Sequence, residues 1–252
     1  MRNIKLTIEF DGTEFVGWQI QPGGLRTVQG VMTEAISRFT SAGMGGEDVK
    51  VTGVGRTDSG VHARAYVLNF LTTTNIPTEG FVKGLNAELP DDVFVKSAED
   101  VSLEFNARRD AKKKTYLYRI VNSGHRRSPL ERNRAWSVEE PLDIELMKEA
   151  AAVLVGKKDF TSFCAAGSCV STFVREIFSF TVKDLGDGLI ELEVSGGGFL
   201  KYMVRIMVGN IVMVGAGKLT IDELRTIIEA RDREVASITA PSRGLYFKEV
   251  EY

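Results

Sequence analysis

The chain has 252 residues and a formal net charge of -2, with 43% hydrophobic and 26% charged residues. These values are typical of soluble globular proteins and argue against disordered, collagen-like and coiled-coil chains. The length allows one large domain or two of ordinary size, each with enough apolar surface for a core.

The chain has two cysteines, Cys164 and Cys169, and two histidines, His62 and His125. Two cysteines cannot form a disulfide framework, which favours a reduced, cytoplasmic setting. Neither histidine lies at a ligand spacing from the other or from a cysteine, so we expect no bound metal.

No targeting or membrane segment is expected. The first ten residues alternate between polar and apolar types, whereas a secretory signal needs an unbroken apolar core. The most apolar stretch, residues 199–217, contains Lys201 and Arg205, each of which would cost a few kcal/mol at the centre of a bilayer. This stretch therefore predicts a buried helix.

Apolar periodicity predicts the elements of the first half. Ile4, Leu6, Ile8 and Phe10 alternate with polar residues, as in a half-buried strand, and a helical stripe follows with Thr27 as its N-cap. In chain order, the expected elements are a strand at 4–10, a helix at 28–39, strands at 51–55 and 66–71, a helix beginning at Pro77 and a strand at 93–97.

The second half repeats this pattern. Gly186-Asp187-Gly188 predicts the turn of an antiparallel hairpin, and Thr220 with Glu223 predicts a capping box. In chain order, the expected elements are a strand at 114–122, a helix at 144–154, strands at 173–183 and 189–195, helices at 199–214 and 220–228, and a strand at 245–250.

Strands thus occur in adjacent pairs with helices between the pairs. This order favours an α+β fold with two lobes of largely antiparallel sheet flanked by helices. We expect the active-site cleft to lie between the lobes. We expect an N-terminal lobe at residues 1–106 and a C-terminal lobe at residues 107–252.

The charge is unevenly distributed along the chain. Residues 107–134 contain ten Lys or Arg and two acidic residues, whereas the rest of the chain has 22 basic and 32 acidic residues. A dense basic segment is typical of a protein that binds a polyanion, although it can also be a solvated surface. Tyr116 and Tyr118 interrupt the segment, and aromatic rings among cations favour RNA or single-stranded nucleic acid.

Residues 53–63, GVGRTDSGVHA, form the most unusual local sequence. Glycines allow close approach of another backbone, and an Asp on such a loop is either a catalytic carboxylate or a cap of the turn. Arg205 lies in the middle of the apolar helix, where it must either extend its charge to solvent or find an acidic partner.

Taken together, several segments resemble the tRNA pseudouridine synthase A family. They follow the family's order along nearly the whole chain, which makes the set far more specific than any one piece. The segments are 10–21 (FDGTEFVGWQIQ), 27–30 (TVQG), 55–63 (GRTDSGVHA), 105–108 (FNAR), 114–119 (KTYLYR), 159–163 (DFTSF), 198–205 (GFLKYMVR) and 240–246 (APSRGLY).

The resemblance implies a cytoplasmic homodimer that converts uridine to pseudouridine at positions 38, 39 and 40 of the tRNA anticodon stem-loop, without a cofactor or metal. It implies Asp58 as the essential carboxylate, acting either on C1′ or on the C2′ proton. We assign Arg205 to keeping that carboxylate ionised. Tyr116 is expected to stack on the uracil, Arg56 to contact phosphate or the flipped nucleotide, and Leu245 to pack against the base.

The chain also departs from the family pattern. Phe10, Ser59 and Lys201 replace residue types that are more usual there, and Arg64-Ala65-Tyr66 stands where a less bulky segment with Gln is expected. Two alternatives stay open. One is a tRNA-binding or chaperone protein of the same fold without catalysis, and the other is an unrelated two-lobe hydrolase that uses Asp58 as a general base.

Overall fold

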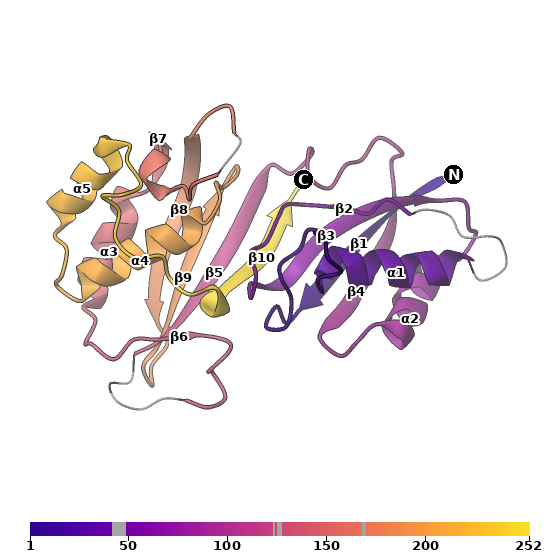
Figure 1. The fold of residues 1–252 in the computed structure, drawn as a ribbon, viewed down its shortest axis with the longest axis horizontal. Coiled ribbons are helices and arrows are strands. Elements are labelled where there is room, and N and C mark those ends of the chain that lie inside the picture. Colours follow the sequence, from indigo (N-terminus) through magenta and orange to yellow (C-terminus); the bar gives the residue numbers. More distant parts are fainter. Residues whose placement is uncertain (42–48, 123, 125–127, 168–169) are drawn as a thin grey trace. The chain divides into compact units, whose positions relative to one another are not determined.

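The structure is a computed structural model that describes residues 1–41, 49–122, 124, 128–167 and 170–252 (Figure 1). His125 and Cys169 lie outside the described residues. The chain divides into two compact units, the first formed by residues 1–112 with 247–252 and the second by residues 113–246. Residues 107–112 and 247–252 thus belong to the first unit, whereas the sequence analysis assigned them to the second lobe.

The first unit is built on a sheet with the strand order β4-β1-β3-β10, in which β1 pairs antiparallel with both β3 and β4, and β2 pairs antiparallel with β3. Leu6 of the central strand lies opposite Leu68 on one side and Ala98 on the other. The strands are β1 (Arg2–Phe10), β2 (Thr52–Gly53), β3 (His62–Thr72), β4 (Val93–Val101) and β10 (Leu245–Glu251).

Two helices, α1 (Val28–Ser41) and α2 (Thr78–Glu88), lie against this sheet (Figure 1). They bury Met32, Ile36, Phe81 and Leu85, which are fully excluded from solvent. Alternation along β1 supplies the matching apolar face of the sheet. The first unit therefore forms a core between one face of its sheet and these helices.

The second unit has the strand order β5-β9-β8-β7, in which each pair is antiparallel, and β6 pairs in parallel with β5. Its strands are β5 (Lys113–Val121), β6 (Trp136–Ser137), β7 (Gly156–Asp159), β8 (Val174–Asp184) and β9 (Leu189–Gly196). Its helices are α3 (Ile144–Val153), α4 (Met203–Gly215) and α5 (Ile221–Ala230), with 3₁₀ turns η1 (Thr161–Phe163) and η2 (Ser242–Gly244).

The predicted α+β class with largely antiparallel sheets is confirmed. The predicted hairpin is also present, because Gly186, Asp187 and Gly188 all take positive φ between β8 and β9. Strands β6 and β7 were missed, since two and four residues are too short to show a periodicity.

Two helix starts differ from the prediction. Pro77 is the N-cap of α2 and not its first helical residue. Helix α4 begins at Met203 and not at residue 199, because Tyr202 before it has a left-handed backbone with φ of 61°. Within the described residues, none of the helices has the length and apolar character needed to cross a membrane.

The predicted capping box at α5 is confirmed, and it provides a stability test. The Thr220 side chain accepts a hydrogen bond from the Glu223 amide, and the Glu223 carboxylate accepts one from the Thr220 amide at 2.7 Å. We expect Thr220→Ala to lower the free energy of unfolding by about 1 kcal/mol, because an amide of the first turn loses its acceptor. Urea denaturation measures this change.

Thr226→Ala on the same helix is the control. Its hydroxyl donates to the Asp222 carbonyl within the helix, and the side chain is exposed. Since alanine has a higher helix propensity than threonine, this variant should be at least as stable as the original chain. An equal loss of stability in both variants would contradict a specific role for the cap.

Candidate active site

Asp58 lies in the loop that connects β2 to β3, and its side chain is half-buried. The amide of Val61 donates to the Asp58 carbonyl at 3.2 Å, which closes a tight turn directly after the carboxylate. The chain therefore reverses direction at Asp58, within the connection between two strands of the first unit.

A second loop, residues 11–26, holds this turn through hydrogen bonds to the residues around Asp58. The amide of Trp18 donates to the Thr57 carbonyl at 3.1 Å, and the amide of Gly60 donates to the Phe15 carbonyl at 3.2 Å. The Ser59 hydroxyl donates to the same Phe15 carbonyl at 3.3 Å. Asp58 is thus held by hydrogen bonds of the residues immediately before and after it.

The 11–26 loop is itself anchored by an ion pair. The Arg26 guanidinium makes two hydrogen bonds with Asp92, at 2.7 and 2.9 Å, and lies 4.1 Å from the centre of the Phe15 ring. These bonds to Asp92 raise the pKa of Arg26 above its ordinary value. A bidentate ion pair and a cation–π contact therefore restrain the Arg26 side chain and the Phe15 ring.

Gln29 and Arg56 join the same network. The Gln29 side chain accepts from Gln19 Nε2 and from the Ile20 amide, both at 3.0 Å, and donates to the Val51 carbonyl at 3.1 Å. Arg56, which is exposed, donates from Nε to Gln19 Oε1 at 3.3 Å. The sequence analysis gave Gln29 no role, and its position in the segment TVQG was the signal that could have identified it.

His62 has a structural position beside this loop. It is buried, and its Nδ1 accepts a hydrogen bond from the Gly12 amide at 3.0 Å, with Asp11 Oδ1 3.1 Å away. Among the described residues, no three His, Cys, Asp or Glu side chains are grouped closely enough to hold a metal ion.

Arg205 lies in the second unit, in the first turn of α4, because that helix begins two residues earlier. A cation there opposes the helix dipole, so other contacts must hold it. Its Nε donates to the Ala240 carbonyl at 2.8 Å, and its guanidinium lies 4.6 Å from the centre of the Tyr202 ring. Sequence reasoning placed this residue in the middle of the helix and missed both contacts.

Tyr118 is an unexpected neighbour of Arg205. It is almost fully buried, and its hydroxyl donates to the Pro241 carbonyl at 2.7 Å. Burial raises the pKa of Tyr118 far above its ordinary value, although Arg205 and Arg243 act in the opposite direction. The phenol therefore stays protonated and links β5 to the segment that precedes η2.

Tyr116 and Leu245 complete the predicted set within the second unit. The Tyr116 ring is half-buried and meets Phe199 edge to face, with 5.0 Å between ring centres. Leu245 begins β10 and is buried, and it belongs to the second unit, whereas β10 from residue 247 onward belongs to the first. The first unit thus holds Asp58 and Arg56, and the second holds the other three predicted residues. The convergence of the two groups on one nucleotide stays a prediction.

Part of the basic segment 107–134 is neutralised within the protein. Arg119 is largely buried, with Glu131 at 2.7 Å and Glu191 at 3.6 Å. Arg109 pairs with Asp110 at 2.9 Å and donates to the Glu104 carbonyl. Other basic side chains of the segment are exposed, namely Arg108, Lys112, Arg132 and Arg134.

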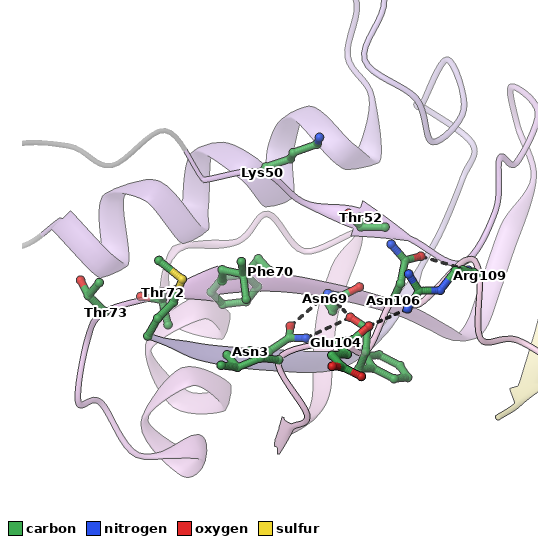
Figure 2. Close-up of a pocket in the computed structure, with 14 residues that line it drawn as sticks. Asn3, Lys50, Thr52, Asn69, Phe70, Thr72, Thr73, Glu104, Asn106 and Arg109 are labelled. Carbon is green, nitrogen blue, oxygen red and sulfur yellow. Dashed lines mark hydrogen bonds between the residues drawn. The ribbon is translucent and has the colours of Figure 1, made fainter.

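A separate hollow with a volume of about 580 Å³ lies in the first unit (Figure 2). A buried amide pair fixes one wall, since Asn69 donates to Asn3 and both side chains donate to the Phe105 carbonyl. Lys50 and Arg109 contribute its cations. None of the five predicted site residues is among the described residues that line this hollow.

Comparison with known proteins points to one family. The family model described as tRNA pseudouridine synthase matches residues 6–110 and 150–252. The chain is 46% identical over 252 residues to a tRNA pseudouridine synthase A of Ruminiclostridium cellulolyticum and 45% identical to one of Pelobacter propionicus, and both alignments cover 100% of each chain.

Similarity to a solved structure is much weaker. The archaeal box H/ACA sRNP Nop10–Cbf5 complex contains a chain that is 12% identical, with a TM-score of 0.33. The alignment covers 83% of this chain and 44% of that one. A likeness at this level supports no structural conclusion.

Gly17 is the contact point between the two loops of the first unit, and this predicts an effect of its substitution. It has φ of 89°, and an added Cβ would lie 2.5 Å from the Thr57 carbonyl oxygen. We expect Gly17→Ala to lose roughly 1 to 2 kcal/mol of stability from the left-handed backbone and a further roughly 1 to 3 kcal/mol from the collision. Urea denaturation measures the sum.

Gly23→Ala separates these two contributions. Gly23 has nearly the same φ, 90°, but an added Cβ there would meet no atom within 4 Å. This variant should therefore lose the backbone contribution alone. Equal losses for Gly17→Ala and Gly23→Ala would show that the contact with Thr57 does not matter for stability.

Proposed function

The chain belongs to the tRNA pseudouridine synthase family, which isomerises uridine to pseudouridine, and on this premise we propose that Asp58 is its essential carboxylate. The observation that carries this assignment is the set of hydrogen bonds on both sides of Asp58, in which the Trp18 amide donates to Thr57 and the Phe15 carbonyl accepts from Ser59 and Gly60. A carboxylate held in this way is already oriented before the substrate binds.

The reaction needs little besides orientation and charge. The N-glycosidic bond breaks, the uracil turns, and C5 bonds to C1′. The C5 proton is lost to solvent and N1 gains a proton, so that product and substrate have the same composition. Asp58 either attacks C1′ or removes the C2′ proton. Both roles require the ionised carboxylate, and no redox cofactor takes part.

The target uridine must leave its stack before it can meet Asp58. We propose that the substrate sites are uridines 38 to 40 of the tRNA anticodon stem-loop, and unstacking there costs a few kcal/mol. Tyr116, whose ring is supported by Phe199, stacks on the extruded uracil, and Leu245 packs against it. Arg56 contacts the phosphate or the flipped nucleotide.

Cations offset the cost of extrusion. The exposed basic residues of segment 107–134 bind tRNA phosphates and release condensed counterions. Arg205 acts on the reacting carboxylate, since a guanidinium keeps its charge at any working pH and favours the ionised form of a neighbouring acid. Its bond to Ala240 and its contact with Tyr202 fix the position of that charge within its unit.

We also propose that the enzyme is a cytoplasmic homodimer in which one tRNA lies in a basic cleft across both subunits. The family resemblance supports this arrangement. Membership of a tRNA pseudouridine synthase family argues against the hydrolase alternative, while tRNA binding without catalysis is an outcome that the next experiment can detect.

The decisive test of Asp58 uses tRNA with tritium at uracil C5, because the isomerisation releases this label. We expect Asp58→Asn to lower tritium release by at least about 100-fold, since the chemical step loses its carboxylate. The dissociation constant for tRNA, measured by filter binding, should change by less than about twofold, because an amide keeps the shape of the side chain.

Asp91→Asn is the matched control, because Asp91 is an exposed carboxylate of the same unit. It should release label at the original rate. Undiminished release by a clean preparation of Asp58→Asn would overturn the site assignment. Tight tRNA binding by the original chain without any release would favour the non-catalytic alternative.

The electrostatic role of Arg205 gives a separate prediction. We expect Arg205→Met to lower the rate of tritium release more than it weakens tRNA binding. The acidic limb of the pH–rate profile should move to higher pH, because a carboxylate without a neighbouring cation is harder to ionise. Single-turnover kinetics from about pH 5 to pH 9 measure both effects.

Arg225→Met, an exposed arginine of α5, controls for the loss of one positive charge in the same unit. It should leave the pH–rate profile in place. If Arg205→Met shows the original rate at neutral pH, Arg205 has no electrostatic role in the reaction.

A further inference from the structure

We propose that Tyr66 is a positioning residue for the reaction, because its buried hydroxyl fixes the start of the loop that carries Asp58. This inference rests on the proposed function of Asp58. Tyr66 belongs to β3 and is fully excluded from solvent.

The Tyr66 hydroxyl holds both polar groups of one backbone residue. It donates to the Gly55 carbonyl and accepts from the Gly55 amide at 3.4 Å. Just before Gly55, the amide of Val54 donates to the Val67 carbonyl of β3 at 2.9 Å. The loop diverges from β3 after this hydrogen bond. The hydroxyl thus gives Gly55, two residues beyond the end of β2, both a hydrogen-bond donor and an acceptor.

Gly55 lies only three residues before Asp58. The Phe15 and Trp18 contacts hold residues 57 to 60, so Tyr66 supplies the restraint at the other end of the loop. With both ends fixed, the backbone of residues 56 and 57 has little freedom to rotate. The direction of the Asp58 side chain depends on that backbone.

The ring of Tyr66 has no room to move. Trp18 lies 4.3 Å away between ring centres, with 31° between the planes, and Phe247 and Phe10 meet the ring at 5.4 and 5.8 Å. Trp18 is the same residue whose amide holds Thr57. The aromatic stack therefore connects the restraint at the start of the loop with the restraint beside Asp58.

Gly53 makes this arrangement possible. A Cβ at that position would collide with the Tyr66 hydroxyl and with the Trp18 indole. The glycine is therefore required by the two aromatic side chains that pack over it. Sequence reasoning interpreted it only as part of a glycine-rich turn.

The expected effect falls on the chemical step. A catalytic group displaced by about 1 Å can lose up to about 100-fold in rate, whereas tRNA affinity comes mainly from phosphate contacts elsewhere. A side chain that only fills the core would change stability and leave kcat alone. A positioning residue lowers kcat at nearly constant KM.

The test is Tyr66→Phe, which keeps the ring and removes the hydroxyl. We expect kcat for tritium release to fall about tenfold, with KM for tRNA changed by less than about twofold. Hydrogen exchange at the amides of Arg56 to Asp58 should become faster by a similar factor, because the start of the loop is released. Thermal unfolding confirms that the variant is folded.

Tyr252→Phe is the matched control in the same unit. Its hydroxyl donates to the Ala107 carbonyl at 3.0 Å and its ring packs on Phe105, so it also loses one tyrosine hydrogen bond. This variant should keep the original kcat and the original exchange at residues 56 to 58. Replacement of Tyr66 by 4-aminophenylalanine puts an N–H donor back and should recover most of kcat.

Either of two results overturns the inference. One is an original kcat in Tyr66→Phe, and the other is unchanged exchange at residues 56 to 58. If the original chain releases no tritium, the proposed function itself fails. The exchange experiment needs no substrate and still decides whether Tyr66 holds the loop.

Discussion

A carboxylate that reacts with a nucleotide has to keep one direction while remaining open to its substrate. Backbone hydrogen bonds help to satisfy the first need here, because they hold the residues on both sides of Asp58. The carbonyl of Phe15 and the amide of Trp18 provide these bonds, and Arg26 with Asp92 holds the loop that carries them. The chemistry proposed for the first unit depends on this contact between two loops.

In the second unit, a cation is held at a helix N-terminus, where the helix dipole disfavours positive charge. Arg205 lies at the positive end of α4, and a backbone carbonyl and an aromatic ring compensate for that position. The buried phenol of Tyr118 stays neutral close by, so it adds no competing negative charge.

The sequence predicted those features that depend on neighbours along the chain. Alternation, the hairpin glycines and the capping box are local, and the structure contains them. The role of Tyr66 could not be read in this way, because its partners Trp18, Gly55 and Phe247 are far apart in the sequence or on another strand. The partial neutralisation of the basic segment could not be predicted for the same reason, since Arg119 of β5 pairs with Glu191 of the neighbouring strand β9.

The first unit is discontinuous, and this affects how it is made. Residues 247–252 belong to it, and β10 lies beside β3, yet the ribosome produces them only after the whole second unit. At typical rates of synthesis that interval lasts on the order of ten seconds. The β3 edge of the N-terminal sheet therefore lacks its β10 neighbour until the ribosome has made residues 247–252.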